Sequence, residues 1–210
     1  MGNGFDFNKM NDEYYDVLRE IGNIGAGNAT TALSQLLNER IDMSVPKVSM
    51  LDFSELPDVL GGAETSVVGI MLSLSMDING MMLFIIEEES AKYMVSNLMQ
   101  CPPSEDGSFS DMDKSALCEV GNIICGAYLY SLGQLTGMTI NASVPSISID
   151  MAGAILSVPA IEFGKMGDKA LFIQSKFGEI DREINGYFIL IPNIESYGKI
   201  LNRLGFTDIT

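Results

Sequence analysis

Histidine is absent from this chain of 210 residues. Without it the protein cannot build a Ser-His-Asp or Cys-His nucleophile system, a histidine metal site or a histidine general base. Any chemistry must therefore come from other side chains.

Cysteine is scarce and does not form a recognisable motif. The three residues Cys101, Cys118 and Cys125 contain no C-x-x-C pair, and their number is odd. Cys118 and Cys125 are seven positions apart and share a face if the segment is helical, so buried thiols are the simplest interpretation. This use of cysteine fits a reducing cytoplasm.

Targeting and membrane signals are also missing. The segment "MGNGFDFNKM" lacks the basic and apolar pattern of a signal peptide, and Asp6 stands where a myristoylation motif has Ser or Thr. The apolar run "SVVGIMLSLSM" is too short to span a bilayer. We expect a cytoplasmic protein with no membrane insertion.

Basic residues are few, 12 against 28 acidic ones, which gives a net charge of −16. A phosphate backbone needs a stripe of Lys and Arg, so nucleic acid is not an expected partner. The hydrophobic content of 47% is enough for a sizeable core. We expect a folded globular domain.

The two halves of the chain repeat each other. Residues 16–46 align without a gap on residues 115–145, with 13 of 31 positions identical, where average composition gives about two by chance. Residues 77–99 also resemble residues 183–205, at an offset of 106 instead of 99. The second half therefore carries an insertion, which we place near residues 164–181.

Each half predicts the same elements. A long helix (11–38 and 111–136) precedes an extended segment through Ser-Val-Pro, a strand hairpin and a closing helix (89–100 and 194–204). The Asn-Gly pairs at 79–80 and 185–186 predict the hairpin turns. The fold class expected is α+β, with helices packed on one antiparallel sheet.

We therefore predict a single domain over residues 1–210, internally duplicated with pseudo-two-fold symmetry. Its repeats cover about 11–100 and 111–205, and the polar segment 101–115 links them. Because one repeat alone would leave its sheet half covered, the two repeats should share one core.

The segment "EIGNIGAGNATTAL" (20–33) contains glycines that do not fit a dinucleotide motif. Thr30 replaces the third glycine, and the segment does not follow a strand. Gly22 and Gly27 recur as Gly121 and Gly126. Since glycine in a helix costs about 1 kcal/mol relative to alanine, these positions need a reason. One explanation for the repeated glycines is close packing of the helices. A second is that a helix face without side chains lets a partner approach closely.

A Glu-x-x-Asn pair also recurs in both halves. Glu20 with Asn23, and Glu119 with Asn122, are three positions apart and project from one helix face. A single pair of this kind is ordinary on a solvated helix, but recurrence within an otherwise apolar run favours a functional role. Four further positions accompany the two pairs at equal spacing in each half: Asp16, Ser115, Pro46 and Pro145.

The doubled pattern Asp/Ser-x3-Glu-x2-Asn-x22-Pro resembles the CheC/CheX/FliY phosphatases of bacterial chemotaxis, and two intact copies resemble the CheC type. The resemblance covers nearly the whole chain. It implies hydrolysis of the phospho-aspartate of the response regulator CheY, with Glu20, Asn23, Glu119 and Asn122 as catalytic residues.

The chemistry of these side chains agrees with that implication. An amide carbonyl can accept a hydrogen bond from water and aim it at phosphorus, which suits Asn23 and Asn122. A carboxylate can pair with a lysine of the regulator, which suits Glu20 and Glu119. The regulator would supply the aspartate pocket and Mg²⁺, so the chain needs no metal or cofactor of its own and no covalent intermediate.

An alternative function is a scaffold without catalysis, which binds phosphorylated CheY and the receptor deamidase CheD, a partner that the family resemblance implies. Asp150 interrupts the apolar strand expected in "SVPSISIDMAGAIL", and an exposed edge there could bind such a partner. A capped strand end at the surface explains Asp150 equally well.

Overall fold

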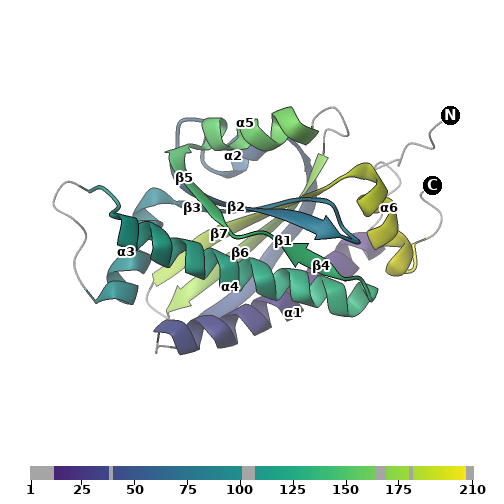
Figure 1. The fold of residues 1–210 in the computed structure, drawn as a ribbon, viewed down its shortest axis with the longest axis horizontal. Helices are drawn as coiled ribbons and strands as arrows, with labels where there is room; N and C mark the ends of the chain where they lie inside the picture. Colours follow the sequence, from purple (N-terminus) through teal and green to yellow (C-terminus); the bar gives the residue numbers. More distant parts are fainter. Residues whose placement is uncertain (1–11, 38–39, 101–106, 164–168, 180–181, 207–210) are drawn as a thin grey trace.

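The computed structural model describes residues 12–37, 40–100, 107–163, 169–179 and 182–206. Two long helices lie side by side on one face of a sheet, two shorter helices cover the other face, and two more lie toward its ends (Figure 1). In that order these are α1 (Asp12–Leu37), α4 (Asp111–Thr136), α2 (Leu56–Val59), α5 (Ala152–Phe163), α3 (Glu88–Met99) and α6 (Ile194–Arg203). The expected α+β class is confirmed.

The described strands form one seven-stranded antiparallel sheet in the order β1-β6-β7-β3-β2-β4, with β5 also paired to β2. The strands are β1 (Asp42–Asp52), β2 (Ser66–Met76), β3 (Gly80–Glu87), β4 (Ile140–Ala142), β5 (Ser146–Met151), β6 (Lys169–Glu179) and β7 (Arg182–Pro192). The first strand of each half therefore pairs with the hairpin of the other half, so neither half forms its part of the sheet alone.

The centre of the sheet is the antiparallel pair β3–β7. Leu83 lies opposite Ile189, and these two residues are separated by the repeat offset of 106 positions. Equivalent residues of the two halves thus face each other at this point, and the strand order is symmetric about it. The duplication itself rests on the sequence, and the symmetric order agrees with it.

Each face of the sheet has its own hydrophobic core. Phe84 and Phe188 stack with ring centroids 4.8 Å apart in the cluster beneath α1 and α4. Leu83 and Ile189 belong to a second cluster beneath α2 and α5. Since side chains alternate along a strand, β3 and the second part of β7 are buried on both faces and read as continuous apolar runs. We expected one core shared by the two halves, and the structure has two, one on each face of the sheet.

The Asn-Gly prediction is right in the first half and wrong in the second. Gly80 begins β3, directly after the turn, and a Cβ there would lie 2.2 Å from the carbonyl oxygen of Ile191. Asn185 and Gly186 instead lie inside β7, because the β6–β7 hairpin extends further before it turns. A Cβ on Gly186 would meet the rings of Phe177 and Phe84, so this glycine makes room for aromatic packing.

The helix predictions are accurate, but the predicted linker is too long. α4 begins at Asp111, where Ser110 accepts from the amide of Asp113 and Asp113 accepts from the amide of Ser110 in a capping box. The segment 101–115 therefore overlaps the helix, and Ser115 belongs to α4. Residues 101–106 lie outside the described residues. The helices α2 and α5 were not predicted from the sequence.

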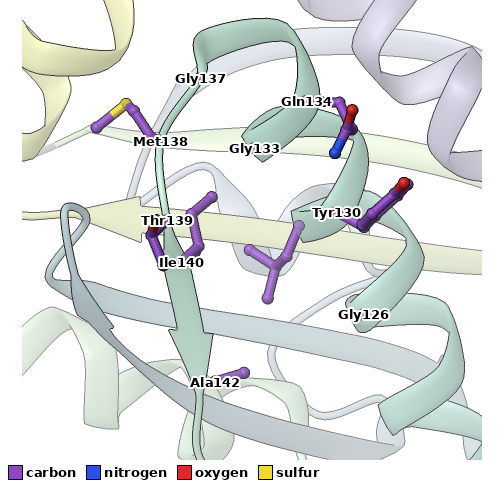
Figure 2. A pocket seen from close by; sticks show the side chains of 10 residues that line it. Gly126, Tyr130, Gly133, Gln134, Gly137, Met138, Thr139, Ile140 and Ala142 are labelled. Atoms are coloured by element: carbon purple, nitrogen blue, oxygen red, sulfur yellow. The ribbon is translucent and has the colours of Figure 1, made fainter.

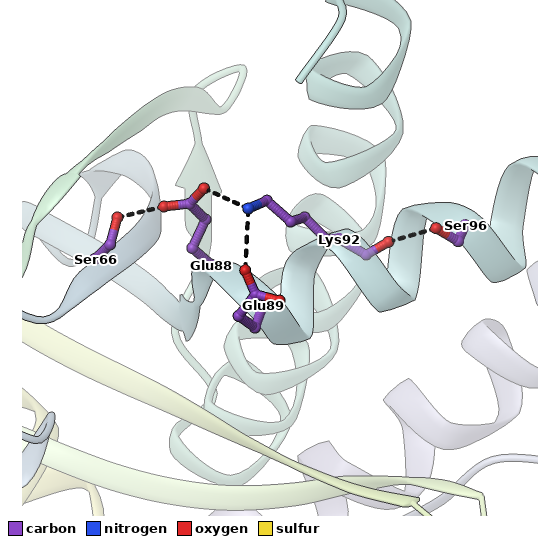
Figure 3. A network of polar contacts seen from close by, with 5 residues as sticks. All are labelled: Ser66, Glu88, Glu89, Lys92 and Ser96. Carbon is purple, nitrogen blue, oxygen red and sulfur yellow. Dashed lines mark hydrogen bonds and ion pairs between the residues drawn. The ribbon is translucent and has the colours of Figure 1, made fainter. Parts of the chain in front are cut away.

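A polar network joins the start of β2 to the start of α3 (Figure 3). Glu88 accepts a hydrogen bond from Ser66, and Lys92 Nζ lies 2.9 Å from Glu88 and 3.0 Å from Glu89. The Ser66 hydroxyl and the Lys92 ammonium together hold the pKa of Glu88 below its ordinary value. The network fixes the point where the chain leaves the sheet for the helix.

Among the described helices, α4 is long and apolar enough to cross a membrane by length and composition. Half of its most apolar window is buried in the fold, and it packs on α1 and on the sheet. Since the core helix of a folded domain passes the same test, this finding is weak evidence for a membrane span.

Two glycines of α4 should respond in opposite directions to alanine. A Cβ on Gly121 would lie 2.8 Å from two carbons of Ile70, whereas Gly126 has open space around it. Overpacking should lower the free energy of unfolding of Gly121→Ala by about 1–3 kcal/mol. Gly126→Ala should raise it by about 0.5–1 kcal/mol through helix propensity. Urea denaturation of the two variants measures these changes in the free energy of unfolding. A shift of both midpoints in the same direction would contradict the packing described.

Candidate functional site

The helices α1 and α4 approach each other closely, and this contact orients both candidate sites. A Cβ on Gly25 would lie 3.0 Å from the Cα of Tyr128, so glycine permits the approach at this point. Asn28 Nδ2 donates to Ser131 Oγ at 3.2 Å across the same contact. With their inner faces held against each other and against the sheet, both helices turn their remaining face to solvent (Figure 1).

The four predicted catalytic residues lie on these outer faces. Glu20 and Asn23 are exposed on α1, and Glu119 and Asn122 are exposed on α4, one helical turn apart in each pair. The structure thus brings each Glu beside its Asn. The two pairs stay on separate helices.

The functional groups of both pairs are exposed to solvent. Within the described part of the chain, no hydrogen bond or ion pair involves the side chains of Glu20, Asn23, Glu119 or Asn122. Two carboxylate oxygens and an amide are therefore available at each pair for an external group. Such a site can accept hydrogen bonds from a cation or a water that a partner brings.

The residues one turn before each Glu behave differently in the two halves. Asp16 Oδ1 accepts from Arg19 at 2.7 Å, and both side chains are exposed. Asp16 is therefore paired with Arg19 and not with the carboxylate of Glu20. Ser115 occupies the equivalent position on α4 and is exposed.

The repeated glycines divide into two kinds. Gly22 and Gly121 are buried, and a Cβ would lie 3.2 Å from Val45 in the first case and 2.8 Å from Ile70 in the second. Close packing of helix on sheet explains them. Gly27 and Gly126 are exposed with nothing within 4 Å, one turn beyond Asn23 and Asn122. Packing does not explain these two.

The repeated prolines interrupt the strand after each helix. Pro46 lies in β1 where the register to β6 shifts, and Pro145 lies between β4 and β5. Proline lacks the amide that the ladder needs, which accounts for both interruptions. Their consequence differs, because Val45 is buried under Gly22 whereas the equivalent Val144 is 88% exposed.

Asp150 lies near the end of β5, beside α5. The two Glu-Asn pairs lie on α1 and α4, which cover the opposite face of the sheet. Asp150 is exposed, and its Oδ1 accepts from the amide of Met151 at 2.8 Å, directly before α5 begins. The strand ends one residue after Asp150, because Ala152 starts a helix, and this agrees with the alternative of a capped strand end at the surface. A pocket of about 270 Å³ between β5 and α5 includes Asp150 and Pro159 in its lining.

Cysteine and metal chemistry have little support in the described residues. Burial raises the pKa of the Cys118 thiol and of the fully buried Cys125 thiol, which makes both poor nucleophiles. Within the same residues, no group of three or more acidic or Cys side chains could hold a metal ion. Cys101 lies outside them.

A second pocket, of about 560 Å³, adjoins the candidate site on α4 and was missed in the sequence. It lies between the last turns of α4 and the strand β4, and both Gly126 and Tyr130 line it (Figure 2). The spacing of 119, 122, 126 and 130 could have indicated that these residues share one helix face. The strand β4 forms the other wall of this pocket, and helical spacing in the sequence does not predict where that strand lies.

Comparisons with known proteins agree with the motif. The CheC-like family model matches residues 15–50, and that of the chemotaxis phosphatase CheX matches residues 68–161. The CheY-P phosphatase CheC of Bacillus subtilis is 37% identical over 203 residues, which cover 95% of this chain and 97% of the relative.

Solved structures share the fold. FliY of Thermotoga maritima superposes with a TM-score of 0.74 at 21% identity, covering 94% of this chain and 98% of that chain. The CheX-CheY-BeF3-Mg²⁺ complex of Borrelia burgdorferi matches with a TM-score of 0.51 at 19% identity, covering 84% of this chain and 97% of that chain. From the doubled motif and the near full-length similarity to CheC, the chain belongs to the CheC family of CheY-P phosphatases.

Proposed function

We propose that this protein accelerates hydrolysis of the phospho-aspartate of CheY through two sites, Glu20 with Asn23 and Glu119 with Asn122. The observation that carries this is the pair of exposed Glu-x-x-Asn turns, without side-chain partners among the described residues, on helices of a CheC-family chain. Each turn is half of a site, which the regulator completes with its own phosphorylation pocket.

The asparagines position water. An amide is not a base near neutral pH, but its oxygen accepts a hydrogen bond and can hold a water in line with the phosphorus–oxygen bond that breaks. The water forms the new bond to phosphorus, the aspartyl oxygen leaves as a carboxylate, and the water's protons pass to phosphate and solvent. Positioning of this kind supplies an acceleration on the order of 10² to 10⁴.

The glutamates dock the regulator. An ionised carboxylate accepts hydrogen bonds only, so Glu20 and Glu119 suit a lysine beside the phosphorylated aspartate. Gly27 and Gly126 have open space one turn further on, which lets the backbone of the regulator come close to Asn23 and Asn122.

The magnesium ion belongs to the regulator in this proposal, and the chain binds no cofactor. The CheX of similar fold was solved with CheY, BeF3 and Mg²⁺, where BeF3 stands in for the phosphoryl group. That complex concerns CheX, and we extend its arrangement to this chain. The same proposal places the protein in the cytoplasm, where CheY exchanges its phosphate.

Changing Asn23→Ala and Asn122→Ala together should abolish accelerated phosphate release and leave binding of phosphorylated CheY within about twofold. The physical reason is that the water contact matters mainly in the transition state. Each single change should retain partial activity. Both residues are exposed, so the free energy of unfolding should shift by less than about 0.5 kcal/mol.

A scaffold without catalysis gives the opposite result. If the double variant released phosphate from CheY at the rate of the unchanged protein, the scaffold function would replace the phosphatase mechanism. Phosphate release, measured beside a binding titration, separates the two.

Charge reversal tests the glutamates. Glu20→Lys with Glu119→Lys should weaken binding of phosphorylated CheY at least about tenfold and slow hydrolysis with it, because a like charge replaces an ion pair. The matched control is Asp58→Lys with Glu162→Lys, which changes the net charge equally through exposed residues of α2 and α5 on the opposite face. Equal affinity of the two double variants would count against the docking role.

We also propose that CheD binds at the β5–α5 corner around Asp150. The support is the exposed carboxylate, the pocket beside it and the exposed apolar side chains Val158 and Ile161 on α5. This corner lies apart from both Glu-Asn pairs, so one chain can hold CheD and CheY at different surfaces.

The variant Asp150→Arg should lower the affinity for purified CheD by at least about tenfold and leave phosphate release from CheY unchanged. Calorimetry with CheD and the phosphate assay measure the two effects. An Asp150→Arg variant that still binds CheD normally would remove the residue from the interface.

A further inference from the structure

We propose that the pocket at the end of α4 receives an uncharged side chain of the same CheY molecule that is docked at Glu119 and Asn122, with Tyr130 as the anchor. The second site then has a docking surface that the first site lacks. This inference rests on the proposed function.

The pocket has the size and lining of a docking site. Its volume is about 560 Å³, and the described lining residues carry no charged side chain. At its rim, the carboxylate of Asp77 accepts from the amide of Thr139 at 2.7 Å. Tyr130 is 61% exposed and stands on α4 beside Gln134, opposite Thr139 and Ile140 (Figure 2).

The pocket continues the catalytic face without a break. Glu119, Asn122, Gly126, Tyr130 and Gln134 follow one another at steps of three or four residues, so they form one stripe along α4. From Asn122 to Tyr130 the helix rises only about 12 Å. A domain of about 100 residues has a radius of gyration near 13 Å. A regulator whose phosphate lies at Asn122 is therefore large enough to cover the pocket as well.

The absence of charged side chains among the described lining residues defines what the pocket can accept, and the rim carboxylate of Asp77 is held by the amide of Thr139. From Val120 to Ile149 the sequence contains no Asp, Glu, Lys or Arg, although the chain carries a net charge of −16. Glu119 at the start of the stripe attracts the lysine, while the pocket favours apolar contact. An exposed tyrosine presents a rigid apolar ring with a polar tip, which is the usual form of an interface anchor.

The first site has no equivalent anchor. The repeat places Thr31 at the position of Tyr130 and Ser34 at that of Gly133. Thr31 is exposed, and its hydroxyl donates to the carbonyl of Gly27 at 3.2 Å. The two sites thus share the catalytic pair and differ in the surface beside it, which predicts different affinities for one substrate.

The experiment uses the full chain with Asn23→Ala, so that only the second site turns over. Adding Tyr130→Ala should raise the KM for phosphorylated CheY about tenfold with kcat within twofold, because the ring contributes to binding and not to the chemical step. Tyr130→Phe should keep the KM within about threefold of the parent, since the ring remains. Binding titrations with CheY loaded with BeF3 and Mg²⁺ should rank the affinities of the parent, Tyr130→Phe and Tyr130→Ala in the same order.

The control is Leu135→Ala in the same Asn23→Ala background. Leu135 is an exposed apolar residue of the same helix that does not line the pocket, and its loss should leave the KM within twofold. Thermal unfolding should show that all variants fold.

The outcomes separate this inference from the proposed function. If Asn122→Ala in the Asn23→Ala background lowers kcat but Tyr130→Ala leaves the KM unchanged, the docking pocket is wrong and the phosphatase site stands. If Asn122→Ala leaves kcat unchanged, the phosphatase mechanism itself fails. A fall in kcat without a change in KM for Tyr130→Ala would also overturn the anchor role.

Discussion

The close packing of α1 against α4 is the contact on which the rest of the arrangement depends. Gly25 lets the backbone of α1 reach Tyr128, and Tyr128 in turn packs on Phe188 at the centre of the sheet, with ring centroids 4.5 Å apart. The Tyr128 hydroxyl shares a 2.6 Å hydrogen bond with Ser175, and burial raises its pKa to about 12. Helix, helix and sheet are fixed by one buried cluster. The exposed faces of both helices, and the Glu-Asn pairs on them, follow from it.

The exchange of strands between the two halves explains why the domain is one unit. β1 pairs with β6, and β5 pairs with β2, so the outer strand of each half completes the hairpin of the other. A half separated from its partner would expose the edges and the faces of its strands, which is unfavourable in water. The two Glu-Asn pairs therefore stand on a common framework that neither half forms alone.

The two Glu-Asn pairs need no core position, and this is why the sequence alone could single them out as candidates. Glu20, Asn23, Glu119 and Asn122 are exposed residues at helical spacing, and their recurrence within one sequence distinguishes them from ordinary surface residues. The role of Asp16 could not be predicted in the same way. Arg19 competes for its carboxylate through an i, i+3 pair, and spacing alone does not say which neighbour is preferred.

By itself, the sequence determined the two halves, the two long helices, the antiparallel hairpins and the residues of both Glu-Asn pairs, because these depend on local spacing and on identity between repeats. The tertiary structure decided what depends on contacts between distant segments. It placed Asn185 and Gly186 inside β7, gave the sheet a second covered face under α2 and α5, and assigned Gly121 to packing but Gly126 to open space. It also formed the pocket beside Tyr130, because one wall of that pocket is β4, which pairs with β2 of the other half.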